Sequence, residues 1–226
     1  RILTSAHVAA GGMTVEVAFS KDGYTERHNA TVVGRAPGGE DLALLDLDGG
    51  KAIDCPALTL GDSDALRLGE FVIALGHPSG LRGAVTLGVV SGKVTLPVSS
   101  VPQELTASDA DEETRSGEGA TVPYLVTDAA FAGGMSGGPL LDPSGAVVGV
   151  STFVRPELRG LGNYAIASNR AAKVIEEIAQ AAAGEAARFC VGFRVLLFND
   201  RFNKRAHVEA VLKEGGLSAE EARVAM

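Results

Sequence analysis

The sequence predicts an all-β protein, built as a sandwich or as a pair of barrels. Short runs rich in Val, Leu, Ile and Thr alternate with turn residues over most of the chain. No helical pattern interrupts these runs before residue 168. The 226 residues suit one large all-β domain, or one domain with an additional fragment.

The predicted strands begin at residues 14–19, where Val15, Val17 and Phe19 alternate with other side chains and KDG follows as a turn. Further strands are expected at residues 30–36, 41–47, 71–75, 83–96, 123–129, 145–154 and 163–168. The segments PGGE, GDSD, GHPSG and DPSG separate several of them and are rich in turn formers. Many short strands without intervening helices indicate a sandwich or barrels rather than an α/β fold.

Residues 104–119 interrupt this pattern with six acidic residues, one arginine and almost no large apolar side chain. Such a composition is typical of a solvated surface loop.

A helix is expected over residues 169–189, with Ser168 or Asn169 as its cap and Gly184 as a stop. Its apolar face is formed by Val174, Ile175 and Ile178.

The composition changes after this helix, and we expect a domain boundary near residues 184–188. Residues 189–200 predict a strand and residues 204–216 a helix. A capping box from Ser218 to Glu221 predicts the start of another helix.

Composition also excludes several classes of protein. The net charge of -8 argues against a nucleic-acid binder, because such proteins usually present a basic face. No apolar run approaches the roughly 18 residues of a membrane span. Two cysteines, Cys55 and Cys190, predict no disulfide framework and fit a reducing compartment.

Residues 130–141, AFAGGMSGGPLL, place four glycines around one serine and one methionine. Three interpretations compete: a phosphate-binding loop, a nucleophile with an oxyanion hole, and a flexible loop. A P-loop needs a lysine that this stretch lacks. The segment GLGNYA at 160–165 matches the dinucleotide fingerprint, but polar RPELR precedes it where an apolar strand is required. A nucleotide-binding protein is therefore disfavoured.

The nucleophile interpretation needs a base for Ser136 and backbone N–H groups aimed at the developing oxyanion. A tight loop through Gly134, Met135 and Ser136 can supply these N–H groups. His7 ends an apolar strand-like run, and Asp41 opens a buried strand where an ionised acid rarely lies unpaired. Each residue alone is more often structural. Together they follow the chain order His, Asp, Ser of chymotrypsin-type proteases.

Five blocks of the sequence, in order, resemble a Deg/HtrA-type serine protease. They are ILTSAHV, DLALL, GHPSG with TLGVVSG, TDAAFAGGMSGGPLLDPSGAVVGVST, and GLGNYAIASN. The resemblance implies a protease domain over 1–184 made of two chymotrypsin-like six-stranded barrels, the first incomplete at its N-terminus. It also implies a triad of His7, Asp41 and Ser136 in the cleft between the barrels, working without cofactor or metal.

The same resemblance implies an oxyanion hole at Gly134, Met135 and Ser136, and a specificity pocket with Ala130 at its floor. Because Ala130 has no carboxylate that could pair with an Arg or Lys of the substrate, we expect small aliphatic side chains directly before the scissile bond. The family usually has asparagine where Met135 and His77 stand. The strands before His7, the trimer-forming segment near them and a following PDZ domain are not in this sequence, and a homotrimer stays an expectation.

The segment FRVLLFNDRFNKRAHVEAVLKEGGLSAEEARVAM resembles the first half of ClpS, the adaptor of the Clp protease. It implies a partial ClpS-like α/β domain over 189–226. Asn199 and Asp200 match positions that recognise the α-amino group of a destabilising N-terminus, whereas Arg201 replaces an aspartate or asparagine. NDRFNKR is closest to the plastid form, so a chloroplast location is expected, although this chain shows no targeting segment.

These resemblances predict a serine endopeptidase that cleaves unfolded or damaged proteins in protein quality control. The alternatives are a catalytically silent protease-like scaffold and a Clp-protease adaptor that works through the ClpS-like tail. No nucleic acid and no membrane span are expected.

Overall fold

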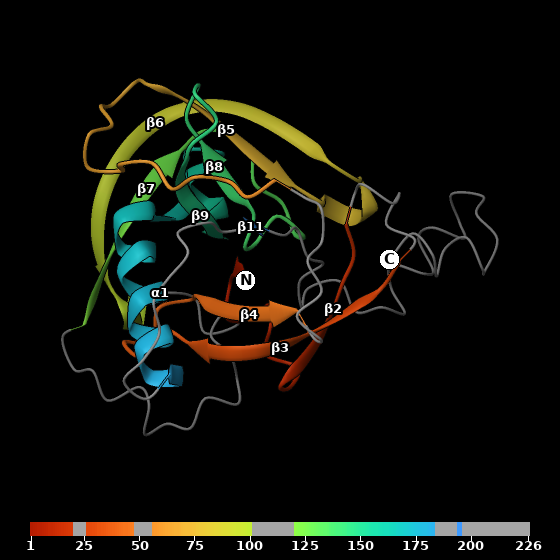
Figure 1. Cartoon of the computed structure of the whole chain (residues 1–226). Coiled ribbons are helices and arrows are strands. Elements are labelled where there is room, and N and C mark those ends of the chain that lie inside the picture. The colour runs from red at the N-terminus through yellow and green to blue at the C-terminus, as the bar shows by residue number, and fades with distance from the viewer. Residues whose placement is uncertain (20–25, 48–55, 101–119, 184–193, 196–226) are drawn as a thin grey trace, which may run out of the picture.

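The computed structural model describes residues 1–19, 26–47, 56–100, 120–183 and 194–195, and it consists mostly of strands with one α-helix. The strands form a five-stranded sheet in the order β11-β1-β4-β3-β2 and a closed barrel in the order β10-β7-β6-β5-β8-β9 (Figure 1). The elements are β1 (Ile2–Thr4), β2 (Thr14–Val17), β3 (His28–Arg35), β4 (Ala43–Leu47), β5 (Phe71–Gly76), β6 (Ala84–Pro97), β7 (Thr121–Thr127), β8 (Pro139–Leu141), β9 (Val147–Val154), β10 (Asn163–Ala167), α1 (Ser168–Ala183) and β11 (Arg194–Val195). The all-β class is thereby confirmed.

Of the two implied barrels, the structure shows one closed barrel, and the first, which is expected to be incomplete, is not confirmed as a barrel. The C-terminal half closes into a six-stranded barrel, whereas the described strands of the N-terminal half form an open sheet. Strand β11 pairs parallel with β1, and it is the only part of the predicted ClpS-like segment that the structure describes. The domain boundary near 184–188 and the acidic segment at 104–119 lie outside the described residues.

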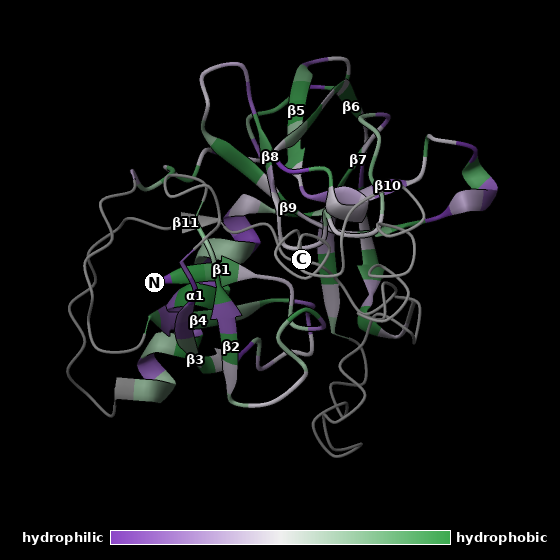
Figure 2. Ribbon diagram, turned by 90° about the vertical axis from the view of Figure 1, so that its right-hand side faces the viewer, coloured by the Kyte–Doolittle hydropathy of each residue, from purple (hydrophilic) through white to green (hydrophobic). Residues whose placement is uncertain are grey.

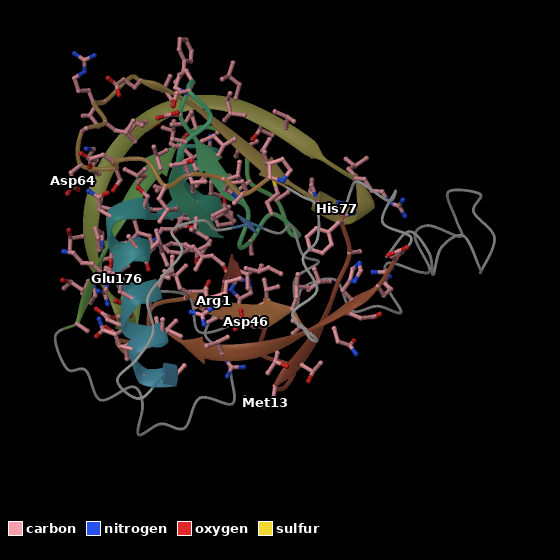
Figure 3. All side chains as sticks on the ribbon, viewed as in Figure 1. Arg1, Met13, Asp46, Asp64, His77 and Glu176 are labelled. Carbon is pink, nitrogen blue, oxygen red and sulfur yellow. The ribbon has the colours of Figure 1, made fainter. Side chains whose placement is uncertain are left out.

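Strand β1 lies inside the N-terminal sheet, between β4 and β11. Ile2, Leu3 and Thr4 are fully buried, and Ile2 pairs antiparallel with Leu45 of β4. At the start of the chain, the Arg1 side chain donates to Asp46 Oδ1 over 3.2 Å, and Figure 3 labels both residues. An apolar strand of this kind is typical of a central position in a sheet.

The barrel strands carry apolar residues on both faces. In β5, Val72 and Ala74 are buried inside the barrel, while Phe71 is exposed on the outer face. In Figure 2, β1 and β5 are mostly coloured hydrophobic. The alternation follows from the two-residue period of a strand, which sends successive side chains to opposite faces.

One hydrophobic cluster joins the two halves. Leu3, Leu42 and Leu44 of the N-terminal half pack with Tyr124 and Phe153 of the barrel. Helix α1 adds residues to this cluster from its buried face, namely Ala171, Val174, Ile175 and Ile178. In Figure 1, α1 runs along one side of the molecule from the barrel to the N-terminal sheet. The cluster therefore holds both halves and α1 at fixed relative positions.

Helix α1 starts at Ser168, close to the predicted start, but its cap differs from the prediction. The Ser63 hydroxyl accepts the backbone N–H of Asn169 over 3.1 Å. The Ser168 hydroxyl instead donates to the carbonyl of Gly61 over 2.7 Å. A residue distant in sequence thus provides the oxygen that a free helix N–H requires, because the barrel packs against the start of the helix. The described part of the chain holds no helix long and apolar enough to cross a membrane.

Candidate active site

His7 lies in a tight turn directly after β1. The backbone N–H groups of Val8 and Ala9 donate to the carbonyls of Ser5 and Ala6, over 3.2 and 3.1 Å. Ala6 and Ala9 of this turn pack in one cluster with Ile2 of β1, and His7 is only 1% exposed. Burial of β1 therefore determines where the imidazole lies.

Asp41 lies two residues before β4 and is buried. Its Oδ1 accepts the backbone N–H of His7 over 2.9 Å, and its Oδ2 lies 2.7 Å from Nδ1 of the same residue. A buried carboxylate is stable only when it accepts hydrogen bonds from its surroundings. The first contact holds the backbone of His7 and the second holds its imidazole at Nδ1, so that Nε2 is the ring nitrogen left for proton exchange.

Thr152 of β9 provides a third hydrogen bond to the same carboxylate. Its hydroxyl donates to Asp41 Oδ2 over 2.6 Å, across 111 positions of sequence. Its backbone carbonyl accepts the hydroxyl of Ser136 over 3.3 Å. Thr152 therefore contacts both Asp41 and Ser136. Its role cannot be predicted from the sequence, because nothing in VSTFV distinguishes this threonine from other strand threonines.

Ser136 lies in the glycine-rich loop before β8. Gly134 has a φ of +98°, in the region that favours glycine, and a Cβ there would lie 2.5 Å from the carbonyl oxygen of His77. The backbone N–H groups of His77 and Ser79 donate to the carbonyls of Gly134 and Gly133, over 3.2 and 3.3 Å. The segment that starts at His77 therefore holds this loop through backbone contacts.

The directions of two backbone N–H groups follow from these contacts. In a trans peptide the C=O and the N–H point in opposite directions. Because the carbonyl of Gly133 points at Ser79, the N–H of Gly134 points away from that segment. The carbonyl of Met135 likewise accepts the N–H of Gly138 over 3.0 Å, so the N–H of Ser136 points the other way.

The Met135 side chain points into the barrel core rather than toward the predicted oxyanion hole. It is 1% exposed and packs in a cluster with Ala74 and Leu140. A Cβ on Gly76 would lie 2.2 Å from Met135 Cγ, so the glycine makes room for the methionine. Met135 contributes to the loop through its backbone and its packing.

The remaining predicted site residues are placed as follows. Ala130 is exposed, and its carbonyl accepts the hydroxyl of Thr86 over 2.9 Å. Asn199 and Asp200 lie outside the described residues. The part of the chain that the structure describes contains no cluster of three or more residues suited to a metal ion.

The weak dinucleotide match at residues 160–165 has the wrong structural context. It leads into strand β10, not into a helix. A phosphate at such a loop needs the N-terminus of a helix. The structure therefore argues against nucleotide binding here.

Comparisons with known proteins agree with this arrangement. The model of the trypsin-like peptidase domain family matches residues 1–150. HhoB of Synechocystis sp. is 35% identical over 179 residues, and a DegP-like protein of Chlamydia pneumoniae is 34% identical over 182 residues. Each match covers 78% of this chain, which spans 37% and 32% of the two relatives.

Two solved structures resemble the fold. The HtrA-type protease AlgW bound to a decapeptide matches with a TM-score of 0.59 at 31% identity, over 79% of this chain and 48% of that one. The inactive form of the Rv3671c protease matches with a TM-score of 0.59 at 26% identity, over 78% of this chain and 77% of that one.

Proposed function

The chain belongs to the trypsin-like peptidase family, and from this premise we propose that it is a Deg/HtrA-type serine endopeptidase. The observation that carries the proposal is the set of hydrogen bonds from His7 and Thr152 to Asp41, next to the loop of Ser136. Relatives named as DegP-like endoproteases and as an HtrA-type protease support the assignment.

In the proposed reaction, Ser136 Oγ attacks the carbonyl carbon of the scissile peptide bond. His7 Nε2 takes the hydroxyl proton and then gives it to the leaving amine, so that an acyl-enzyme forms. A water molecule then attacks the acyl-enzyme with His7 as the base again, and the carboxylic acid product leaves while the Ser136 hydroxyl is restored. Asp41 holds the imidazole in the tautomer with the proton on Nδ1. The N–H groups of Gly134 and Ser136 stabilise the oxyanion.

We propose that the substrates are unfolded or damaged proteins cut after small aliphatic residues. The absence of a carboxylate at Ala130, the predicted pocket floor, supports this preference over Arg or Lys. Mapping the ends of cleaved peptides checks the proposal, and a preference for Arg or Lys contradicts it. Homotrimer formation, a Clp partner bound through the ClpS-like tail, recognition of a destabilising N-terminus by Asn199 and Asp200, and a chloroplast location stay predictions.

A fluorophosphonate probe tests the nucleophile directly, because only an assembled triad makes a serine react quickly. We expect fast labelling of Ser136 in the parent chain and none in Ser136→Ala. Turnover of unfolded casein should be lost in the same variant, with little change in folding. Equal activity of parent and variant on casein contradicts the assignment.

A catalytically silent, protease-like binding module is the second candidate function. The observation in its favour is the open sheet formed by the described N-terminal strands, because His7 lies in the turn that follows β1 of this sheet. Such a module would bind an unfolded protein without cleaving it, and Ser136 would not react with the probe. Slow labelling together with retained binding of casein would support this candidate.

A further inference from the structure

A nearly buried ion pair lies next to Asp41. The side chain of Glu40 is 4% exposed, and its Oε1 accepts Nε of Arg170 over 2.6 Å and also contacts Nη2 of the same arginine. Arg170 in addition donates from Nη1 to Glu177 Oε1 over 2.8 Å and from Nη2 to Glu177 Oε2 over 3.2 Å. The guanidinium therefore joins the residue before Asp41 to helix α1.

The turn before Asp41 is shaped around the Glu40 carboxylate. A Cβ on Gly38 would lie 2.7 Å from Glu40 Oε2, so a larger residue there would have to displace the Glu40 carboxylate from its present position. Gly39 has a φ of +80°, and the N–H of Leu42 donates to the Glu40 carbonyl over 2.7 Å. The structure thus explains the two glycines of PGGE: Gly38 lies against the Glu40 carboxylate, and Gly39 has a positive φ.

Helix α1 is a rigid support for Arg170. Val174 and Ile175 are buried in the cluster that joins both halves of the molecule, and the Ser63 hydroxyl accepts the N–H of Asn169. Glu176, labelled in Figure 3, lies on the exposed side of this helix. Arg170 therefore reaches the Asp41 segment from an element that packing already holds in place.

The charged groups in contact with this pair decide how it interacts with Asp41. Asp41, Glu40 and the more exposed Glu177 are the carboxylates, and Arg170 is the cation between the last two. Burial, and then the charges of Asp41 and Glu40, raise the pKa of Tyr124. The hydroxyl of Tyr124 on β7 therefore stays neutral beside both carboxylates. Without Arg170, Glu40 would be an uncompensated buried charge one residue from Asp41.

We propose that Glu40 and Arg170 are positioning residues that hold Asp41 in the orientation in which it accepts hydrogen bonds from His7 and Thr152. The inference rests on the proposed function. Asp41 has a buried neighbour on each side, namely Leu42 in the core and Glu40 in the ion pair. Loss of the ion pair leaves Leu42 as the only one of these two neighbours that is held in place. The carboxylate can then rotate or shift, and both oxygens lose their alignment with the imidazole.

The test compares Arg170→Met and Glu40→Gln with the parent chain. The matched control is Glu177→Gln, which removes a partner of the same arginine but keeps its contact with Glu40. We measure the rate of fluorophosphonate labelling at Ser136, the unfolding temperature, and the low-field proton NMR signal of the His7 Nδ1–H. The last signal reports on the hydrogen bond to Asp41 even if no reaction occurs.

We expect Arg170→Met and Glu40→Gln to label roughly 10- to 100-fold more slowly, because small displacements of a catalytic group cost about this much. Their low-field signal should shift or broaden, while Glu177→Gln should match the parent. Arg170→Lys should be intermediate, since it keeps the charge but loses the planar fork. If Arg170→Met does not fold, Arg170→Lys and Glu40→Gln still decide the question.

Parent-like labelling and an unchanged low-field signal in folded Glu40→Gln and Arg170→Lys would overturn the proposal, even if both variants melt at a lower temperature. That result would leave the ion pair with a purely structural role. Failure of the parent chain to label contradicts the proposed function instead. In that case the NMR signal alone still tests whether the pair positions Asp41.

Discussion

Replacing Thr152 with valine should lower both the stability and the reactivity of the protein. The substitution keeps the branched shape and the backbone carbonyl but removes the hydroxyl that donates to Asp41 Oδ2 over 2.6 Å. Thr152 is 3% exposed, so water cannot easily replace the lost donor. A hydrogen bond to a charged group contributes about 1.5–3 kcal/mol, and we expect a loss of stability in this range.

The reactivity should fall because Asp41 Oδ2 then keeps only its contact with His7 Nδ1. A carboxylate with fewer hydrogen bonds holds the imidazole less rigidly, and we expect roughly tenfold slower labelling of Ser136. Urea unfolding of parent, Thr152→Val and Thr152→Ser measures the change in stability, with serine as the control that retains a hydroxyl. A valine variant that equals the parent in stability and labelling rate would refute the role assigned to Thr152.

Three further predictions concern residues around the site. Asp41→Asn should slow the labelling of Ser136 by up to about four orders of magnitude through the wrong histidine tautomer, and a parent-like labelling rate would contradict this. Tyr124→Phe should leave stability unchanged or raise it by about 1 kcal/mol in thermal unfolding, because the buried hydroxyl has no hydrogen-bond partner among the described residues; a clear loss of stability would argue against it. Burial, and then the charge of Arg82, lower the pKa of His77 below its usual 6.5, so the unfolded chain binds the proton more readily and stability should fall as the pH drops from about 6.5 through the folded pKa. The unfolding temperature of His77→Asn should therefore decrease less between pH 7.5 and pH 5 than that of the parent, and equal decreases would contradict the argument.

Much of the architecture could be predicted because strand and helix patterns are local. The alternation in residues 71–75 and the helical spacing of Val174, Ile175 and Ile178 depend only on residues that are close in the sequence. The structure confirms both elements. The resemblance implies an incomplete first barrel, and the described N-terminal strands form an open sheet. Local patterns could not predict this, because closure of a sheet depends on strand pairing and not on the pattern of any single strand.

The candidate site was predicted in part. His7 ends one apolar run and Asp41 opens another, which makes them candidates from the sequence, and the structure places them in contact. The sequence predicts Ser168 or Asn169 as the cap of α1, yet the Ser63 hydroxyl accepts the N–H of Asn169. Sequence patterns cannot identify such a partner, because it approaches from another part of the chain.

The sequence by itself determined the all-β class, the helix and the residue types that can carry acyl-transfer chemistry. Only the tertiary structure decided which buried hydroxyl donates a hydrogen bond to Asp41 and which cation forms the ion pair with Glu40. Thr152 and Arg170 lie 111 and 130 positions from their partners, and the chain holds other threonines and arginines of the same local appearance. The choice among them depends on the register of β9 and on the packing of α1 against both halves, and these are set by burial of the shared core.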